Sequence, residues 1–158
     1  MKTNKQHLLL ICLALSALCL LLDQWSKHLA AASLKGKPPI SLIPGVLELT
    51  YVENTGVAFG MLHRTSIFPL ILGIILLCAL LGFCVHLRKI LDRISVCFLS
   101  LLLSGAVGNL VDRIRLGFVV DFIYIRLIRF PVFNIADCCV VLGTFGLGFW
   151  LWTKGDGK

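Results

Sequence analysis

Apolar residues along the chain form four long blocks that are separated by short polar stretches. The blocks cover about residues 8–32, 66–87, 94–112 and 134–152. Each is close to the roughly 20 residues that a helix needs to cross membrane hydrocarbon at about 1.5 Å per residue. Because backbone groups inside lipid must be satisfied within their own segment, we expect all four to be helices. The pattern predicts a mainly α integral membrane protein in which residues 1–158 form one membrane domain.

The first block carries features of two different kinds of segment. Its basic start and the run Ala30-Ala31-Ala32 are typical of a cleavable signal peptide. However, Asp23 and Lys27 fall on one helix face, and a cleavage region does not usually follow such a pair. We therefore favour a retained membrane helix, with Asp23 and Lys27 as a structural ion pair near its end.

Residues 35–64 interrupt the membrane pattern with turn signals such as Pro38-Pro39 and Pro44-Gly45. Between these turns, residues 46–52 alternate between apolar and polar, which is the period of a half-buried strand. We expect a small extracytoplasmic β region here, outside the membrane core. Asn54 follows this run beside Gly56, where the local sequence favours an ordinary turn residue.

Charged residues near the block ends predict the orientation. Four spans place both termini on one side, together with the short connection that contains Arg88, Lys89 and Arg93. Dense positive charge beside span ends favours the cytoplasm, so we expect cytoplasmic termini and an outward-facing β region. We interpret Trp150 and Trp152, near the end of the last block, as interfacial anchors.

Composition narrows the possible functions. The chain is 58% hydrophobic, with a mean hydropathy of +0.95, which is too apolar for a soluble domain. Its net charge of +7 comes from Lys and Arg that flank apolar blocks, so we expect membrane anchoring and no nucleic acid. Seven cysteines lie inside the blocks without CxxC spacing or nearby histidines, and we interpret them as buried apolar residues. No metal or cofactor is expected.

The most polar part of this apolar chain is residues 108–137. It holds three of the eight carboxylates, two asparagines and four arginines. Ionisable residues at membrane depth are costly, so such a cluster indicates a functional site. Asp121 is the sole charge in the strand-like run 118–125, and we favour a functional role for it. Asn134 and Asp137 are spaced as a helix capping box, which is a sufficient structural explanation for that pair.

The polar residues at the end of the third block also have both a functional and a structural explanation. Asn109 and Arg113 lie one turn apart on one helix face, and Gly105 and Gly108 leave room for another backbone to approach. These residues fit a functional site, but they also fit interhelical hydrogen bonding with a snorkelling arginine. We interpret Asp112 as the partner of a neighbouring arginine.

Two carboxylates offer the clearest chemistry. If Asp121 and Asp137 lie close together, they cannot both ionise cheaply, so one of them keeps a proton. The ionised group would take a proton from a water that attacks a carbonyl, and the protonated group would polarise that carbonyl and supply the leaving amine. This is aspartic peptide hydrolysis. The helix start favours a charged Asp137 and the apolar flanks favour a protonated Asp121, but the assignment of base and acid stays open.

The polar residues fall into five ordered motifs. In chain order, the motifs are Asp23 with Lys27, Asn54-Thr-Gly-Val-Ala-Phe59, Gly108-Asn-Leu-Val-Asp-Arg113, Val119-Val-Asp-Phe122 and Phe133-Asn-Ile-Ala-Asp137. These motifs resemble those of the bacterial lipoprotein signal peptidases, also called signal peptidase II. Val57 is the one departure that we identify, at a position where that family often has alanine.

The resemblance implies a membrane aspartic endopeptidase of the bacterial inner membrane. Such an enzyme removes signal peptides from diacylglyceryl-modified prolipoproteins by cleaving before the lipidated cysteine. It implies lipid-modified prolipoproteins and membrane lipids as partners and no cofactor or metal, and we expect a monomer. The implied roles are catalysis for Asp121 and Asp137, substrate binding or ordering of that pair for Asn54, Asn109, Arg113 and Asn134, and support of the fold for Asp23 and Lys27.

Two other classes of protein compete with this interpretation. A small four-span transporter or channel subunit should carry ionisable residues near the bilayer midplane, whereas the middles of these spans are apolar. A purely structural membrane subunit would leave the two isolated aspartates without a role.

Overall fold

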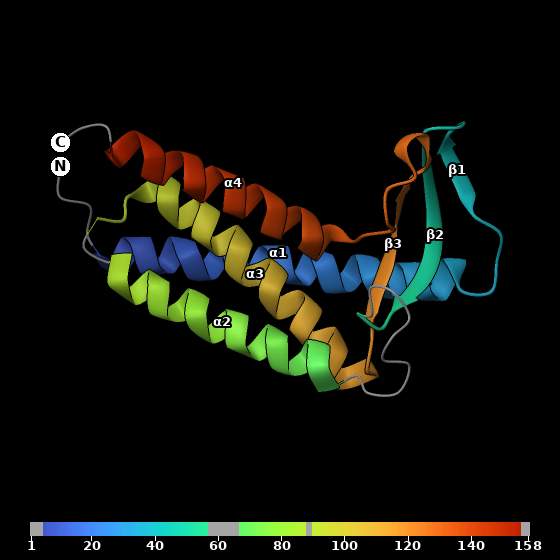
Figure 1. The fold of residues 1–158 in the computed structure, drawn as a ribbon, viewed down its shortest axis with the longest axis horizontal. Coiled ribbons are helices and arrows are strands. Elements are labelled where there is room, and N and C mark those ends of the chain that lie inside the picture. The colour runs from blue at the N-terminus through green and yellow to red at the C-terminus, as the bar shows by residue number, and fades with distance from the viewer. Residues whose placement is uncertain (1–4, 57–66, 88–89, 156–158) are drawn as a thin grey trace.

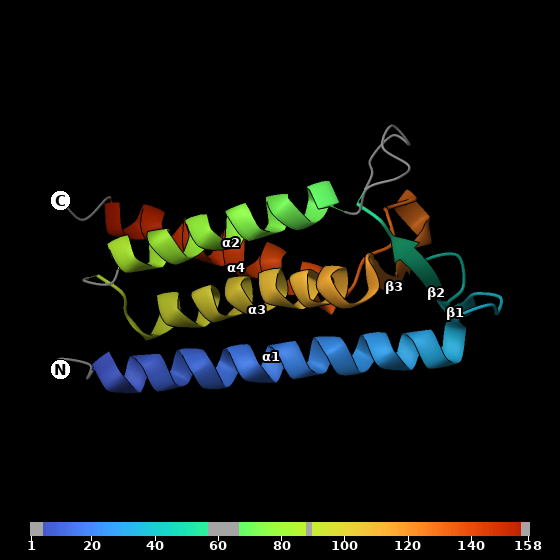
Figure 2. The same ribbon diagram turned by 90° about the horizontal axis from the view of Figure 1, so that it is seen from below.

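Four helices run alongside one another in the computed structural model, which describes residues 5–56, 67–87 and 90–155 (Figure 1). All four are long and apolar enough to cross a membrane, so the expected mainly α membrane fold is confirmed. The start of the first helix and the end of the last lie at one end of the bundle, and a small sheet lies at the other (Figures 1 and 2). The helices are α1 (Lys5–Leu34), α2 (Ile67–Leu87), α3 (Arg93–Leu116) and α4 (Ile135–Gly155).

Three of the helices, α1, α3 and α4, continue past the expected ends of their blocks. The third block was expected to end near residue 112, but α3 continues to Leu116. Gly117 ends it in the left-handed conformation, with φ of 83°, and donates its backbone N–H to the carbonyl of Arg113. The α1 helix reaches Leu34 and extends beyond the rest of the bundle beneath the sheet (Figure 1).

The sheet has three antiparallel strands in the order β1 (Ile40–Ile43), β2 (Leu47–Asn54) and β3 (Val119–Ile125). The pairing of β2 with β3 places Val52 opposite Asp121. A single-turn 3-10 helix, η1 (Arg126–Ile128), follows β3. The expected β region therefore exists and gains a third strand from beyond α3. Residues 57–64 of the expected region lie outside the described residues.

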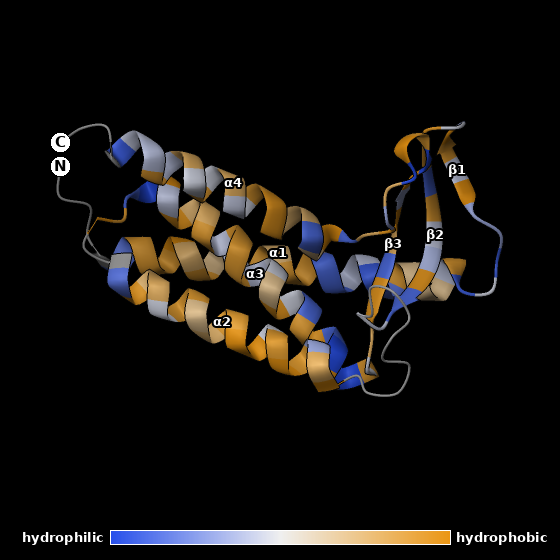
Figure 3. Ribbon diagram, in the orientation of Figure 1, coloured by the Kyte–Doolittle hydropathy of each residue, from blue (hydrophilic) through white to orange (hydrophobic). Residues whose placement is uncertain are grey.

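The sheet is held in place by the projecting part of α1. Ala30 and Leu34 on α1 pack against Val120 and Phe122 on β3, and all four side chains are buried. Figure 3 shows hydrophilic residues gathered at the sheet-side ends of α3 and α4 and on the part of α1 that lies beside them, next to a mostly hydrophobic bundle. This packing brings β3, and Asp121 with it, over the polar helix ends.

At the opposite end of the bundle, the expectation that Trp150 is an interfacial anchor is wrong. Trp150 is 5% exposed and packs with Leu99 and Leu147, so it is not an interfacial anchor. Its indole N–H donates to Oδ2 of Asp92, 3.0 Å away, at the start of α3. A buried indole needs such a partner, and the carboxylate provides it. Trp152 is 64% exposed and fits the anchor role.

Candidate active site

Asp121 and Asp137 come together at the sheet-side end of the bundle, one from β3 and one from the first turn of α4. Asn134 contacts both of them. Its side-chain amide donates to Oδ1 of Asp121 at 2.6 Å, and its backbone N–H donates to Oδ2 of Asp137 at 3.2 Å. Asp121 is 1% exposed, whereas Asp137 is only partly buried. The two carboxyl groups therefore share a binding partner but occupy different environments.

The capping box expected at residues 134–137 is present. Asn134 accepts a hydrogen bond from the backbone N–H of Asp137 at its Oδ1, 3.0 Å away, and the Asp137 carboxylate accepts the Asn134 backbone N–H in return. These reciprocal bonds fix the carboxylate in the first turn of α4. Capping and a functional role are thus compatible, because the cap itself sets the position of the Asp137 side chain.

Asn54, at the end of β2, holds the second oxygen of Asp121. Its amide N–H donates to Oδ2 of Asp121 at 2.7 Å. Its carbonyl oxygen accepts the backbone N–H of Gly56 at 2.8 Å. The Gly56 N–H can only donate, so it fixes which way the Asn54 amide faces. The turn expected at this position therefore also directs a donor at Asp121.

Asn109, on α3, makes the corresponding contact with Asp137. Its amide N–H donates to Oδ1 of Asp137 at 2.7 Å, and its carbonyl oxygen accepts from the Lys27 ammonium at 3.0 Å. A second donor to that oxygen is the side-chain amide of Asn134, at 3.2 Å. Because Lys27 has no acceptor atom, it forces the carbonyl of Asn109 toward itself and the N–H groups toward the carboxylate.

Lys27 is the buried centre of an ion cluster beside the site. Its side chain is 3% exposed, and its ammonium lies 2.9 Å from Oδ2 of Asp23 and 3.1 Å from Oδ2 of Asp112. With Asn109 as the third acceptor, all three ammonium hydrogens have partners. The ionic partner of Asp112 is therefore Lys27 and not a neighbouring arginine, because the helices bring α1 against this face of α3.

The two aspartates of the cluster also fix the neighbouring elements. Asp23 accepts the backbone N–H of Ala136 at 2.9 Å, which satisfies a free donor in the first turn of α4. Asp112 accepts the backbone N–H of Val120 at 3.2 Å, next to Asp121 in β3. The cluster thus ties together the segments that carry the two site aspartates.

Gln24 is a site neighbour that the sequence analysis missed. Its amide donates to Oδ1 of Asp112 at 2.9 Å and to the Gly108 carbonyl at 3.3 Å. Gly108 also leaves room for the neighbouring Asp23, since a Cβ atom there would lie 2.6 Å from a carboxylate oxygen of Asp23. The available signal was spacing, because Gln24 is three residues before Lys27 and so shares its helix face.

Arg113 lies beside the pair without a complete set of partners. Its Nη1 donates to the Asn109 carbonyl at 3.3 Å, while its Nε is buried and has no hydrogen bond within the described part of the chain. Its charge interacts with those of Asp121 and Asp137, but the residues described form no ion pair with it. A buried donor without a partner is costly, which is typical of a group that binds a ligand.

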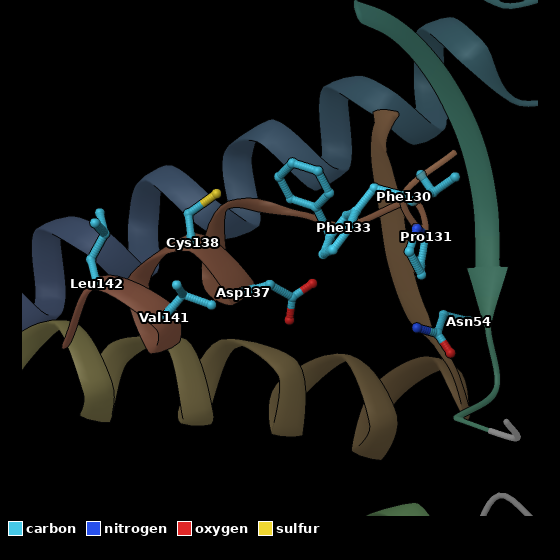
Figure 4. Close-up of a pocket in the computed structure, with 9 residues that line it drawn as sticks. Asn54, Phe130, Pro131, Phe133, Asp137, Cys138, Val141 and Leu142 are labelled. Atoms are coloured by element: carbon cyan, nitrogen blue, oxygen red, sulfur yellow. The ribbon is translucent and has the colours of Figure 1, made fainter. Parts of the chain in front are cut away.

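A cavity of about 590 Å³ opens beside these residues. In Figure 4, the Asp137 carboxylate points into the space between α4 and Asn54. Apart from these two polar side chains, the walls are largely apolar. They are formed by Phe130, Pro131, Val132, Phe133, Cys138, Val141 and Leu142.

Burial and charge favour a shared proton at the site. Burial raises the pKa of Asp121, and the negative charge of Asp137 raises it further, while hydrogen bonds from Asn54 and Asn134 act in the opposite direction. The surrounding cluster contains more acids than bases. Its four carboxylates and two cations are Asp23, Asp112, Asp121 and Asp137 with Lys27 and Arg113.

The arrangement places two carboxyl groups, one of them with a raised pKa, beside a cavity, and such a pair suits acid and base catalysis on one substrate. Within residues 5–56, 67–87 and 90–155, no three His, Cys, Asp or Glu side chains are placed to hold a metal ion. Residues 57–59 of the second motif, including Val57, lie outside the described residues.

Comparisons with known proteins agree with this arrangement. A family model described as signal peptidase (SPase) II matches residues 15–153. The chain is 38% identical to a lipoprotein signal peptidase of Streptococcus thermophilus, over 87% of this chain and 89% of that one. It is 44% identical to a lipoprotein signal peptidase of Clostridioides difficile, over 78% and 82% of the two chains.

Solved structures resemble the whole fold. One, titled a bacterial membrane enzyme structure at 2.3 Å resolution, superposes with a TM-score of 0.78 at 31% identity, over 93% of this chain and 90% of that one. A second, with the same kind of title at 1.9 Å resolution, gives a TM-score of 0.76 at 32% identity, over 89% and 91% of the chains.

Proposed function

The chain belongs to the signal peptidase II family of membrane aspartic peptidases, and on this basis we propose that Asp121 and Asp137 are its catalytic pair. The supporting observation is that Asn134 donates to both carboxyl groups at the edge of a cavity. The reaction is cleavage of the signal peptide from a lipoprotein precursor. The transporter or channel alternative is not favoured, because the family assignment covers most of the chain.

In this proposal Asp137 is the base and Asp121 is the acid. Asp137 lines the cavity, where it meets water, and its carboxylate accepts the Asn109 amide N–H and the Asn134 backbone N–H in the first turn of α4. The pKa of Asp121 is raised by burial, so this group holds the proton. Asp137 takes a proton from the attacking water, and Asp121 polarises the scissile carbonyl and then protonates the leaving amine.

Arg113 is proposed to bind the substrate backbone. Its Nε has no hydrogen-bond partner among the described residues, so the guanidinium can turn to donate to a substrate carbonyl. Its Nη2 lies 4.0 Å from the position that a Cβ on Gly56 would occupy, which places the guanidinium at the Asn54 turn. A peptide held between this turn and α4 would present its scissile bond to Asp137.

The cavity suits a substrate that carries lipid. Val141 and Leu142 continue its apolar wall along α4, away from Asp137 and into the membrane-spanning part of the helix. We propose that acyl chains of a diacylglyceryl-modified cysteine lie along this wall while the peptide reaches the carboxylates. Phe130 and Phe133 cover the opposite side and would exclude water from the bond being cut.

The proposal also covers supporting residues and placement. Asn54, Asn109 and Asn134 orient the two carboxyl groups, and Asp23 with Lys27 holds α1 against α3 and α4. The enzyme would act as a monomer in the bacterial inner membrane, with cytoplasmic termini and the sheet on the outer side.

The test is cleavage of a diacylglyceryl-modified prolipoprotein by the full chain in detergent. We expect Asp121→Asn and Asp137→Asn each to reduce the cleavage rate by about 10³-fold, because each removes one proton-transfer group. Glu53→Gln is the matched control. It neutralises a carboxylate next to Asn54, on the exposed end of β2, and should leave the rate unchanged.

Thermal unfolding of each variant separates lost chemistry from lost folding. Both aspartate variants should unfold as cooperatively as the unmodified protein. Undiminished cleavage by either one would contradict the assignment of the pair. An unmodified precursor that is cleaved equally well would contradict the proposed acyl-chain wall while leaving the pair intact.

A further inference from the structure

An unusual set of exposed apolar residues lies at the rim of the sheet. Leu127 and Ile128 in η1 are 69% and 65% exposed, and Ile43 and Phe130 are 51% and 47% exposed. The first two are as exposed as Leu21 within the α1 membrane span, which is 68% exposed. We call Ile43, Leu127, Ile128 and Phe130 the apolar rim. Exposed apolar clusters of this kind mark interaction surfaces.

Backbone hydrogen bonds make the apolar rim one continuous surface. The Val46 N–H donates to the Ile43 carbonyl at 3.0 Å, and the Arg126 N–H donates to the Val46 carbonyl at 2.8 Å. The Phe130 N–H donates to the carbonyl of Ile125, at the end of β3, at 3.1 Å. The β1–β2 turn and η1 are thus held against each other.

The backbone conformation of Arg129 holds the tip of this surface outward. Arg129 has φ of 50°, which is unfavourable for a residue with a side chain, and its N–H donates to the carbonyl of Arg126 at 3.1 Å. This tight turn presents Leu127 and Ile128 at its apex, away from the protein core. A strained turn that exposes two large apolar side chains to water needs a compensating contact.

The apolar rim is continuous with the membrane-spanning surface. Ile128 is followed after six residues by Ile135, where α4 begins. Phe130 stacks edge-to-face on Phe133, with ring centroids 5.7 Å apart, and both rings line the cavity that contains Asp137. The contact surface therefore runs from α4, past the mouth of the cavity, to η1.

The charges beside the apolar rim are positive. Arg126 and Arg129 flank Leu127 and Ile128 and are exposed, and Arg126 is partly neutralised by Glu48 at 2.7 Å. An apolar tip flanked by arginines fits the boundary between acyl chains and anionic headgroups.

We propose that the apolar rim inserts into the lipid headgroup layer on the sheet side, with Arg126 and Arg129 bound to anionic phospholipid headgroups. The cavity mouth then lies at the membrane surface, where an anchored substrate reaches it by lateral diffusion. This inference concerns a lipid contact and does not depend on which residues catalyse cleavage.

The direct test measures contact with acyl chains. A tryptophan is introduced in the full chain by Leu127→Trp. The variant is reconstituted in vesicles of phosphatidylcholine and phosphatidylglycerol whose brominated acyl chains quench tryptophan fluorescence. We expect about half of the added emission to be quenched, as for a side chain at the acyl boundary. Lys37→Trp is the control, because Lys37 lies in the α1–β1 connection at the far end of the molecule from the bundle (Figure 1).

Equal and weak quenching at both positions would overturn the proposal. So would quenching of the Leu127→Trp signal only when precursor is added, or only at high protein density, since these outcomes indicate the substrate or a second copy as the occupant. Quenching that persists without precursor, is independent of protein density and is weakened by Arg129→Gln supports the contact with anionic lipid.

A second readout uses activity. The double variant Leu127→Ser with Ile128→Ser should raise KM for a lipid-anchored precursor about fivefold in vesicles, with kcat unchanged, because the surface affects only encounter with the substrate. In detergent micelles KM should not change. Ile40→Ser, at an apolar position that is 50% exposed at the far end of β1, is the control. An unchanged KM in vesicles would contradict the proposal.

Discussion

The two ends of the bundle each begin a helix with a capping box, yet the two boxes have different surroundings. At the start of α3, Asp92 accepts the backbone N–H of Ser95, and the Ser95 hydroxyl accepts the N–H of Asp92. At the start of α4, Asn134 and Asp137 make the equivalent reciprocal pair. The hydrogen-bonding pattern of the two boxes is the same. The carboxylate belongs to the first residue of the box at α3 and to the fourth residue of the box at α4.

The difference lies in what surrounds each carboxylate. Asp92 is 37% exposed, accepts the Trp150 indole and lies 3.6 Å from the Lys154 ammonium. Burial alone would raise the pKa of Asp92, but its hydrogen bonds and the Lys154 charge outweigh burial and lower it. Asp137 instead faces a cavity and interacts with a second, fully buried carboxyl group. A capping motif therefore does not indicate function, whereas an incompletely compensated charge beside a cavity does.

The same substitution in both capping boxes tests whether their carboxylates differ in function. Asp137→Asn should reduce cleavage about 10³-fold, because it removes the base. Asp92→Asn should leave cleavage within about twofold, because asparagine also caps helices and an exposed ion pair contributes little. Initial rates with saturating lipidated precursor measure both. A large loss of activity in Asp92→Asn would mean that the two carboxylates are not functionally distinct.

The ion cluster should dominate stability at the sheet-side end. Lys27→Met leaves Asp23 and Asp112 buried without their cation, which should lower the free energy of unfolding by about 3–5 kcal/mol. Thermal unfolding in detergent measures the change. Lys154→Met is the matched control at the other end, where the exposed pair should contribute no more than about 1 kcal/mol. Equal effects of the two substitutions would remove the distinction between the ends.

The orientation of Asn109 should affect the chemical step. Asn109→Ala removes a charge-assisted hydrogen bond to Asp137, which is worth about 1.5–3 kcal/mol and corresponds to a 10- to 100-fold lower kcat. Ser104→Ala is the control on the same helix, because its hydroxyl donates to the Leu101 carbonyl and lies outside the cavity lining. A change in KM alone would assign Asn109 to substrate binding instead.

The pH dependence should report Asp121. Its pKa is raised, so its neutral form stabilises the fold at pH below the ordinary carboxyl range, and this contribution is lost as pH rises through the raised pKa. Asp121 also loses the proton that it supplies in catalysis over the same pH interval. We therefore expect kcat to fall about tenfold per pH unit above the raised pKa.

Asn54 provides the check on this assignment. The hydrogen bond from Asn54 lowers the pKa of Asp121, so Asn54→Ala should move the alkaline limb of kcat to higher pH. A limb that moves to lower pH, or stays in place, would mean that Asp121 is not the group that titrates.

The helices and the isolated position of Asp121 could be predicted because their signals are local. Apolar block length gives the spans, and the isolation of Asp121 in an apolar run follows from the sequence alone. The spacing of Asp23 and Lys27 likewise indicated their pairing, which the structure contains. Each of these signals lies within one continuous segment of the sequence.

The remaining contacts depend on which elements meet in space. The pairing of β2 with β3 joins Val52 to Asp121 across an intervening pair of helices, and no local pattern specifies that register. The partners of Gln24 and Asp112 could not be identified for the same reason, since they depend on how α1 packs against α3. The burial of Trp150 was missed because its acceptor, Asp92, belongs to another helix.

The fixed orientation of the Asn109 amide matters for the proton gradient across the membrane. A row of buried ionisable groups in a bilayer is the usual basis of a proton wire. Here, Lys27 and Asp137 are separated by the Asn109 amide, which does not exchange protons readily and is held in one orientation. Toward the termini, the bundle is closed by the apolar contacts of Leu99, Leu147 and Trp150. We therefore expect the enzyme to cycle protons at its site without dissipating a transmembrane proton gradient.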